Sequence, residues 1–172
     1  MAVGLFSLFM SQDDIIKGAE HDLLQGSAPK IDLETYEISG TTDETFNKWF
    51  DEISYEKFKQ VWADKDLRKI IESRIRYPYG KHEWLMVGRA DKFKEWGISM
   101  DDVKSLTSPT STLKFANPWG IHGGFGSTTA HNEILGLIDS ATSYDEYIYM
   151  LNEWAMDRLL NGILDLPEGL RR

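Results

Sequence analysis

The sequence predicts a helix-rich α+β domain with a small antiparallel sheet that bears a glycine-rich loop. Apolar residues recur at helical spacing in several segments after residue 41. Two short runs, residues 84–87 and 110–116, have the apolar or alternating pattern of strands. With 172 residues, of which 41% are hydrophobic, the chain can bury one sizeable core. We therefore expect one main domain over residues 41–172, after an N-terminal arm over residues 1–40.

Composition narrows the classes of protein to which the chain can belong. Cysteine is absent, which excludes disulfides and thiolate metal sites. The formal net charge of −9 argues against non-specific wrapping of nucleic acid, because such binding needs an excess of Lys and Arg.

The average charge hides an asymmetry along the chain. Residues 1–60 carry five basic and twelve acidic side chains, whereas residues 65–114 carry eleven basic and seven acidic ones. A polyanion could therefore meet a basic face, and an ordinary solvated helix face is the alternative interpretation. The basic residues in question are Arg68, Lys69, Arg74, Arg76, Lys81, Arg89, Lys92 and Lys94.

The N-terminal arm opens with an apolar stretch, residues 1–10. This stretch lacks the basic flank of a signal peptide and is too short to span a bilayer. We expect a packed or partner-covered turn there, and no stable membrane association. Residues 25–40 have the composition of a linker. Apolar positions in that linker could add one weak strand: Ile31, Leu33, Tyr36 and Ile38.

Three helices are expected at the start of the main domain. Thr41 and Glu44 have the spacing of a capping box, and Ser54 can cap the second helix. The third helix should end at residues 77–80, because proline disfavours helical geometry in the residue before it. The predicted apolar positions are Phe46, Trp49, Phe50 and Ile53, then Phe58, Val61 and Trp62, then Leu67, Ile70, Ile71 and Ile75.

Shorter elements are expected next. Residues 84–87 predict a strand or a buried edge. Residues 90–96 predict a short helix closed by Gly97, and Ser99 can cap another helix that carries Val103 and Leu106. Residues 110–116 predict a second strand, because Leu113 and Phe115 alternate with polar neighbours.

Two helices complete the predicted domain. The first covers residues 129–140, with Thr128 or Thr129 as its N-cap. The second starts at a capping box formed by Ser143 and Glu146, and Gly162 is its predicted left-handed stop. Its apolar stripe is expected in the core: Tyr147, Ile148, Leu151, Trp154, Ala155 and Leu159.

The candidate chemical site is the loop over residues 121–132, where His122 and His131 stand at the two ends of a run of glycines and hydroxyl residues. Histidine is the side chain whose ordinary pKa lies nearest neutrality, and glycines let a backbone approach a ligand closely. Two histidines that flank one phosphodiester could act as general base and general acid without a metal or cofactor. His82, in another segment, is the third catalytic candidate.

A phosphate at this loop would need donors and positive charge. If His131 lies in the first turn of its helix, free backbone N–H groups and the helix dipole favour an anion there. Lys81 or Arg89 could stabilise the developing charge, and Glu83 and Asn132 could support the histidines. The alternative is structural: a hydroxyl only caps the helix and the glycines only form a turn. The predicted substrate-binding loop residues are Gly124, Ser127, Thr128 and Thr129.

A metal-dependent nuclease site is the competing interpretation of the same residues. A histidine together with Glu83, Asn132 or Glu133 could hold one ion that stabilises the leaving oxygen. The sequence has no His-x3-His, no His-Glu-x-x-His and no paired Asp-x-Asp spacing, so this interpretation ranks second.

Four segments follow one another in a characteristic order: residues 81–87 (KHEWLMV), 93–99 (FKEWGIS), 122–133 (HGGFGS followed by AHNE) and 166–170 (LPEGL). This succession resembles the C-terminal toxin modules of bacterial polymorphic toxins, which are fused to Rhs-type, contact-dependent or type VII-secreted carriers. The resemblance spans residues 41–172, and residues 1–40 would then be a remnant of the pre-toxin junction.

The resemblance implies a small antibacterial effector that is secreted or translocated into the cytoplasm of a target bacterium. Such effectors are frequently nucleases, and a cognate immunity protein neutralises them in the producing cell. Residue by residue, His82, His122, His131 and the hydroxyls of residues 127–129 match the roles typical of metal-independent members.

Several functions therefore remain open at this stage. The leading hypothesis is a metal-independent RNase toxin, for which RNA is a better candidate substrate than DNA. A metal-dependent DNase toxin and a toxin that attacks NAD, with the glycine loop on the pyrophosphate, are the enzymatic alternatives. The third class is a non-enzymatic binding or immunity protein, whose acidic surface could cover the basic site of a toxin.

Overall fold

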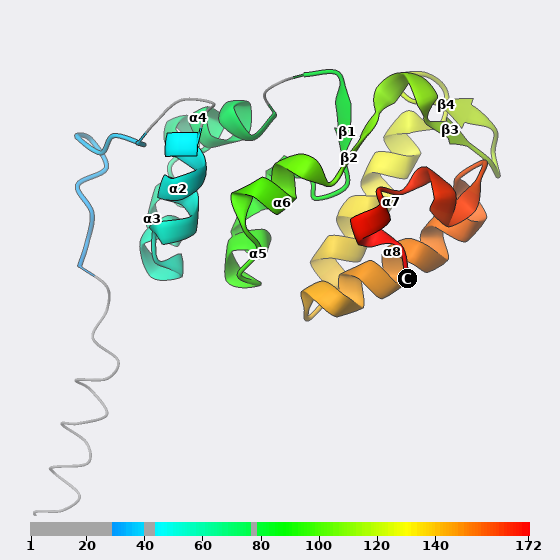
Figure 1. The fold of residues 1–172 in the computed structure, drawn as a ribbon. Coiled ribbons are helices and arrows are strands. Elements are labelled where there is room, and N and C mark those ends of the chain that lie inside the picture. Colours follow the sequence, from blue (N-terminus) through cyan, green and yellow to red (C-terminus); the bar gives the residue numbers. More distant parts are fainter. Residues whose placement is uncertain (1–28, 40–43, 77–78) are drawn as a thin grey trace, which may run out of the picture. The chain divides into compact units, whose positions relative to one another are not determined.

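A computed structural model describes residues 29–39, 44–76 and 79–172, and Ile31–Arg172 form one compact unit (Figure 1). The unit is α+β: helices predominate, and the described residues form two two-stranded antiparallel sheets. The apolar stretch at residues 1–10 and the capping box predicted at Thr41 lie outside the described residues. Within those residues, no helix combines the length and apolar character needed to cross a bilayer.

Three amphipathic helices come first: α2 (Glu44–Glu52), α3 (Tyr55–Ala63) and α4 (Lys65–Arg76). The predicted cap of α3 is confirmed, because the backbone N–H of Lys57 donates to Ser54 Oγ at 3.3 Å. Phe50 and Phe58 pack edge to face with ring centroids 5.2 Å apart and join the two helices. The prediction that Ile70 belongs to the buried apolar face of the third helix is wrong, since 40% of this residue is exposed.

The segment before α2 is irregular, so the weak strand predicted over residues 31–38 is wrong. A turn covers residues 33–35. Ile38 is nevertheless buried in the core, and its carbonyl oxygen accepts a hydrogen bond from Arg74 Nη1 at 2.9 Å. A side chain from α4 therefore satisfies backbone that a sheet partner would otherwise have to satisfy.

The two sheets are small. In one, β1 (Lys81–Glu83) pairs with β2 (Thr107–Pro109). In the other, β3 (Lys114–Phe115) pairs with β4 (Gly120–Ile121). The strand predicted over residues 110–116 is therefore confined to its last part, because a 3₁₀ turn, η2 (Thr110–Thr112), occupies the first.

The apolar run at residues 84–87 forms a buried edge, and its prediction as a strand is wrong. The strand lies just before the run, in β1. Trp84, Leu85, Met86 and Val87 are all buried, and the chain then enters the 3₁₀ turn η1 (Val87–Arg89). The run is apolar because it is packed inside the core, and its backbone makes no strand pairing.

Two short helices follow η1, as predicted. α5 (Ala90–Glu95) ends next to Gly97, whose φ of 71° lies in the left-handed region. α6 (Met100–Ser105) begins where Ser99 Oγ accepts a hydrogen bond from the backbone N–H of Asp102. α5 packs against α3, and α6 packs against α2 and α4, so these short helices complete the helical core of this part.

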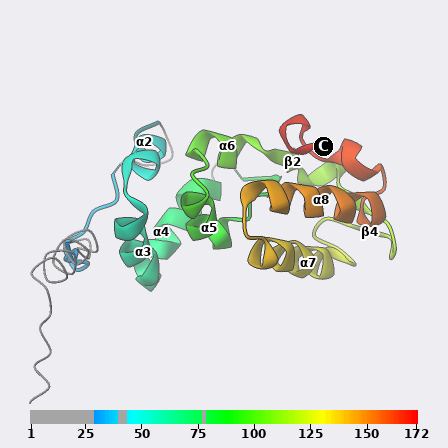
Figure 2. The same cartoon turned by 90° about the horizontal axis from the view of Figure 1, so that it is seen from below.

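The two longest helices among the described residues are α7 (Ser127–Ser140) and α8 (Tyr144–Arg158), which lie side by side (Figure 2). The turns η3 (Gly162–Asp165) and η4 (Glu168–Leu170) follow them. The predicted N-cap of α7 is wrong: the helix begins two residues earlier than predicted, at Ser127, and its cap is Gly126, which adopts a left-handed φ of 82° without a side-chain hydrogen bond.

α8 confirms most of its predicted signature. Ser143 Oγ accepts from the backbone N–H of Glu146, and the whole predicted apolar stripe is buried. The Glu146 carboxylate bonds to Thr142, so the capping box is not closed in its usual reciprocal form. Gly162 is not the stop: the helix ends when Leu159 becomes extended, and Gly162 opens η3.

Candidate functional site

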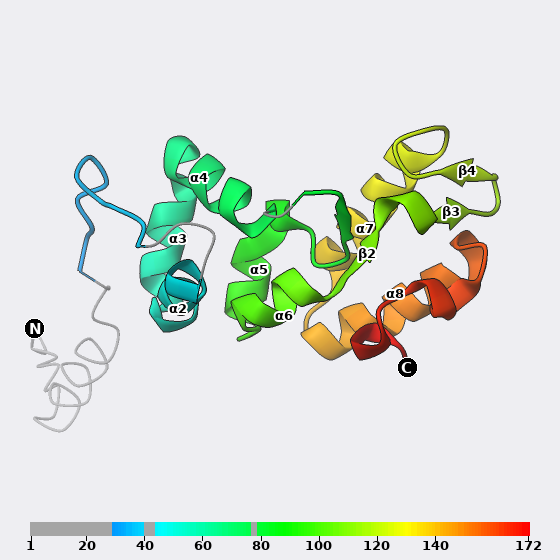
Figure 3. The same cartoon turned by 45° about the horizontal axis from the view of Figure 1, so that its top comes forward.

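Three histidines from three separate segments line one cleft of about 290 Å³. His82 is the middle residue of β1, which is labelled in Figure 1; His122 follows β4 and His131 lies in α7, both of which are labelled in Figure 3. The structure thus brings together the three catalytic candidates that the sequence singled out. The other residues that line the cleft are Arg76, Glu83, Met86, Val87, Gly88, Arg89 and Leu135.

His82 occupies the buried end of the cleft. It pairs across the sheet with Ser108, and its ring meets the Trp84 ring edge to face with centroids 4.4 Å apart. Trp84 is itself fixed, because its indole N–H donates to Ser108 Oγ at 2.9 Å and its carbonyl accepts from the Tyr147 hydroxyl at 2.5 Å. Trp84, which packs against His82, is therefore held by both β2 and α8.

His122 stands between His82 and the solvent. Its backbone N–H donates to the carbonyl of Leu113 at 3.3 Å, which holds the start of the glycine loop against the sheet region. Its ring meets the His82 ring edge to face with centroids 5.2 Å apart. His82 is buried, His122 is half-buried and His131 is exposed. Exposure therefore increases from His82 to His122 to His131.

The surroundings favour the neutral form of two of these imidazoles. Burial, and then the neighbouring His122 and His131, lower the pKa of His82 to about 3. Burial, and then His131, also lower the pKa of His122 below its ordinary value. His82 Nε2 is buried and has no hydrogen-bond partner. At neutral pH both imidazoles are therefore uncharged, and His122 is able to accept a proton.

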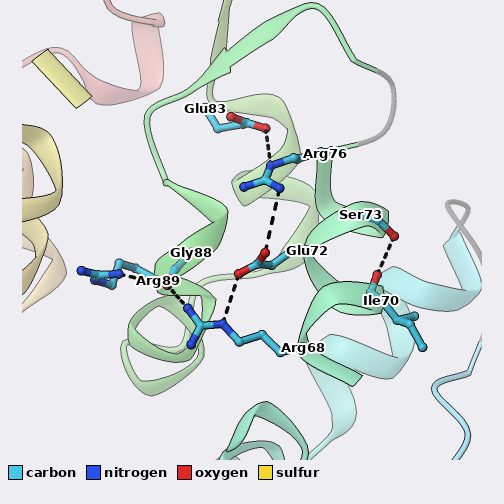
Figure 4. A network of polar contacts seen from close by, with 8 residues as sticks. All are labelled: Arg68, Ile70, Glu72, Ser73, Arg76, Glu83, Gly88 and Arg89. Atoms are coloured by element: carbon cyan, nitrogen blue, oxygen red, sulfur yellow. Dashed lines mark hydrogen bonds and ion pairs between the residues drawn. The ribbon is translucent and has the colours of Figure 1, made fainter. Parts of the chain in front are cut away.

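Glu83 and Arg76, which also line the cleft, lie within ion-pair distance of each other (Figure 4). Arg76 Nε lies 4.0 Å from Glu83 Oε1, and Arg76 Nη1 lies 3.9 Å from Glu72 Oε2. Burial raises the pKa of Glu83, while its own backbone N–H, Arg76 and His131 act in the opposite direction. Glu83 is thus electrostatically coupled to both Arg76 and His131.

Arg89 also lines the cleft, but its charge is already paired. Its Nε and Nη2 donate to the two carboxylate oxygens of Asp139 at 2.6 and 2.8 Å. This bidentate contact raises the pKa of Arg89 and lowers that of Asp139. Of the two cationic side chains that line the cleft, Arg76 has the longer and weaker ion pairs.

The other predicted substrate-binding and supporting residues do not line the cleft. Lys81 is exposed at the start of β1, and Thr128 and Thr129 are exposed on the first turn of α7. Ser127 Oγ accepts from the backbone N–H of Gly123 at 3.1 Å and so fastens the glycine loop to the helix. The remaining two are Gly124 and Asn132, which also lie outside the lining.

The start of α7 does not place His131 at an anion-binding helix terminus. The helix begins at Ser127, so His131 is its fifth residue and lies beyond the first turn of about 3.6 residues. The condition for an anion bound by free N–H groups beside His131 is therefore not met. What His131 faces instead is the cleft that it shares with His82 and His122.

Sequence reasoning missed Arg76 as a site residue and placed it only in the basic face. The available signal was its closeness in the sequence to β1, since Arg76 ends α4 and β1 begins at Lys81. Other members of the predicted basic face hold backbone carbonyls: Arg74 that of Ile38, and Lys94 those of Phe50 and Asp51. Those side chains stabilise the fold.

Among the residues that the structure describes, no group of three His, Asp or Glu side chains is arranged to hold a metal ion. No known protein family, no curated protein and no solved structure matches this chain. The chemistry of the cleft is therefore the ground for a functional conclusion.

Proposed function

We propose that this chain is a nuclease that cleaves RNA by general acid–base catalysis, with His122 and His131 as the catalytic pair. The observation that supports the proposal is the convergence of three histidines and two arginines, from distant segments, on one solvent-open cleft. Histidines gathered in a cleft with perturbed pKa values are typical of catalytic sites.

In the proposed step, neutral His122 takes the proton from a ribose 2′-hydroxyl. The 2′-oxygen then attacks the adjacent phosphorus, the bond from phosphorus to the 5′-oxygen breaks, and His131 gives a proton to the leaving 5′-oxygen. The products are a 2′,3′-cyclic phosphate and a 5′-hydroxyl, and proton exchange with water restores both imidazoles. The lowered pKa of His122 suits it to the role of base.

Arg76 and His82 have supporting roles in this proposal. Arg76 is exposed at the cleft, and its guanidinium can stabilise the charge that develops on the phosphate oxygens. Glu83 forms a long ion pair with Arg76 and in this proposal keeps the guanidinium at the cleft. His82 is a positioning residue, because it is buried and touches His122 edge to face.

The proposal extends to biological role through the resemblance to polymorphic toxin modules. We infer an effector that acts in the cytoplasm of a target bacterium and is bound at home by a cognate immunity protein. Production of the chain in a bacterium without such a partner is then expected to stop growth, and the His122→Ala variant is expected to be harmless. If the parent chain is harmless too, the toxin role is wrong.

The enzymatic proposal is tested with the purified full chain, a labelled single-stranded RNA and EDTA. His122→Ala and His131→Ala are each expected to lower the cleavage rate by at least about 10²-fold. Lys81→Ala, on β1 but outside the cleft lining, is the matched control and should keep the parental rate. A DNA of the same sequence should stay intact, because it lacks the 2′-hydroxyl.

Three results would contradict the proposal. Undiminished cleavage by both histidine variants would remove the acid–base pair. Cleavage that appears only when a divalent cation is added would favour the metal-dependent alternative. Absence of cleavage in every condition would favour a non-enzymatic binding protein.

A further inference from the structure

Two large aromatic side chains are exposed in the segment that contains His122. Trp119 is 64% exposed and Phe125 is 75% exposed, and His122 lies between them in the sequence. Large aromatic side chains contribute strongly to the cores and interfaces of proteins. The exposure of two of them in one short segment therefore points to a contact surface. Ile121, which is 47% exposed, adds to the same surface.

The fold brings Trp119 and Phe125 to one place. Trp119 lies in the turn between β3 and β4, and the glycine loop then folds back so that the carbonyl of Phe125 lies directly against Gly120. Backbone hydrogen bonds from Gly124 to Ile121 and from Ser127 to Gly124 close this loop. The two aromatic residues therefore extend from backbone segments that touch each other.

The support of these aromatic residues is well fastened. Arg158 Nη1 donates to the carbonyls of Ala116 and Asn117, both at 2.6 Å. The backbone N–H of Ala116 donates to the Arg158 carbonyl, and that of Leu160 to the Lys114 carbonyl. The end of α8 thus fixes the β3–β4 hairpin (Figure 3), and Trp119 is exposed on an anchored turn.

The segment that carries these aromatic side chains contains no carboxylate side chain of its own. The chain contains 28 acidic residues, yet none lies between residues 103 and 132. Of the two lysines in that segment, Lys114 is exposed on β3 opposite Ile121, whereas Lys104 belongs to α6 and lies over the Phe46 ring. A chain with a net charge of −9 therefore keeps carboxylates out of the one segment that holds the exposed aromatics and His122.

We propose that Trp119 and Phe125 form a stacking platform for unpaired bases, so that the substrate is single-stranded nucleic acid. This inference rests on the proposed function, because the platform would bind the part of the RNA chain next to the phosphodiester on which His122 acts. Bases can stack on an aromatic face only when they are not stacked within a duplex, and such stacking tolerates any sequence. Lys114 would contact the backbone phosphates beside the platform.

The test measures binding separately from cleavage. The probe is a fluorescent 2′-O-methyl oligoribonucleotide of about 12 nucleotides, which lacks the attacking hydroxyl and stays intact. Fluorescence anisotropy with the full chain at low salt gives its Kd, and the same strand annealed to its complement gives the Kd for duplex. We expect tighter binding to the single strand.

Variants locate the binding surface. Trp119→Ala and Phe125→Ala are each expected to raise the Kd for the single strand by about tenfold, and Trp119→Phe should restore most of the affinity. Tyr149→Ala is the matched control, because Tyr149 is 65% exposed on α8 and lines a different groove. Circular dichroism of each variant checks that the fold is kept.

The outcomes separate this inference from the proposed function. Platform-dependent binding without RNA cleavage upholds the inference and removes the nuclease. Cleavage by a chain whose Trp119 and Phe125 variants bind the single strand as the parent does overturns the inference alone. Equal affinity for single strand and duplex, or no binding of either, also overturns it, and loss of binding to a protein partner in the same variants would identify the platform as a protein interface.

Discussion

The ring of His82 meets the ring of His122 edge to face with centroids 5.2 Å apart, although one residue belongs to β1 and the other follows β4. The contact joins a buried imidazole to a half-exposed one. A change at His82 should therefore alter the orientation of His122, and the cleft behaves as one unit.

As the proposed general base, His122 should give the rate of cleavage a defined dependence on pH. Because the pKa of His122 is lowered from 6.5, the neutral base is already present in mildly acidic solution. We expect kcat/KM to rise with pH through an apparent pKa below 6.5. Above that pKa, the base-dependent part of the profile should reach a plateau. Rates measured from pH 4 to 8 give that limb. An acidic limb centred above 6.5 would show that another group is the base.

Stability should also depend on pH through His82. Its pKa is about 3 in the folded chain and about 6.5 when unfolded, so the unfolded state binds the extra proton between those values. As far as His82 is concerned, the free energy of unfolding is highest above pH 6.5. It decreases as the pH falls towards 3, by about 1.4 kcal/mol per pH unit for one proton. Urea unfolding at a series of pH values measures the slope. His82→Phe keeps an aromatic ring beside Trp84, and its slope should be smaller by this amount; equal slopes would contradict the buried neutral imidazole.

The two arginines that line the cleft should differ in their effect on cleavage. Arg76→Gln is expected to lower kcat/KM by about 10²-fold, because it removes the cation with the weaker ion pairs. Arg89→Gln should cost less than tenfold, since Asp139 already neutralises Arg89. Lys69→Gln, exposed on the same helix as Arg76, serves as the control. Steady-state kinetics that rank Arg89 above Arg76 would reverse the assignment.

Two glycines should respond in opposite ways to alanine. A methyl group at Gly120 would overlap the Phe125 carbonyl, so Gly120→Ala should destabilise the chain by about 1–3 kcal/mol and displace the aromatic platform. Gly136 lies on an exposed stretch of α7 with open space beside its Cα, so Gly136→Ala should stabilise it by about 0.5–1 kcal/mol. Chemical unfolding measures both changes. If Gly120→Ala leaves the free energy of unfolding unchanged, the segments at Gly120 and Phe125 are not in contact in solution.

Local chemistry explains which parts of the fold could be predicted from the sequence. Ser54, Ser99 and Ser143 each cap a helix as expected, because a cap depends only on residues within one turn. The strand of the first sheet was misplaced, because three-residue pairing is decided by the partner β2, which lies far along the chain. The apolar pattern of Trp84 reports burial, which a strand and a packed edge share.

The candidate site was predictable in its residue types but not in its arrangement. The histidines stood out because their chemistry is rare among side chains, whereas their meeting depends on contacts between distant elements. Arg76 was missed because its role appears only once α4 and β1 lie together. Conversely, Ser127 was selected for phosphate binding, but its hydroxyl is engaged by the Gly123 backbone.

The hydroxyl of Tyr147 holds the carbonyl of Trp84, and so couples the depth of the cleft to the position of α8. A shift of α8 along its axis would displace Trp84 and, with it, the His82 ring that packs against Trp84. A displacement of α8 would therefore change the cleft from a distance, without anything entering it.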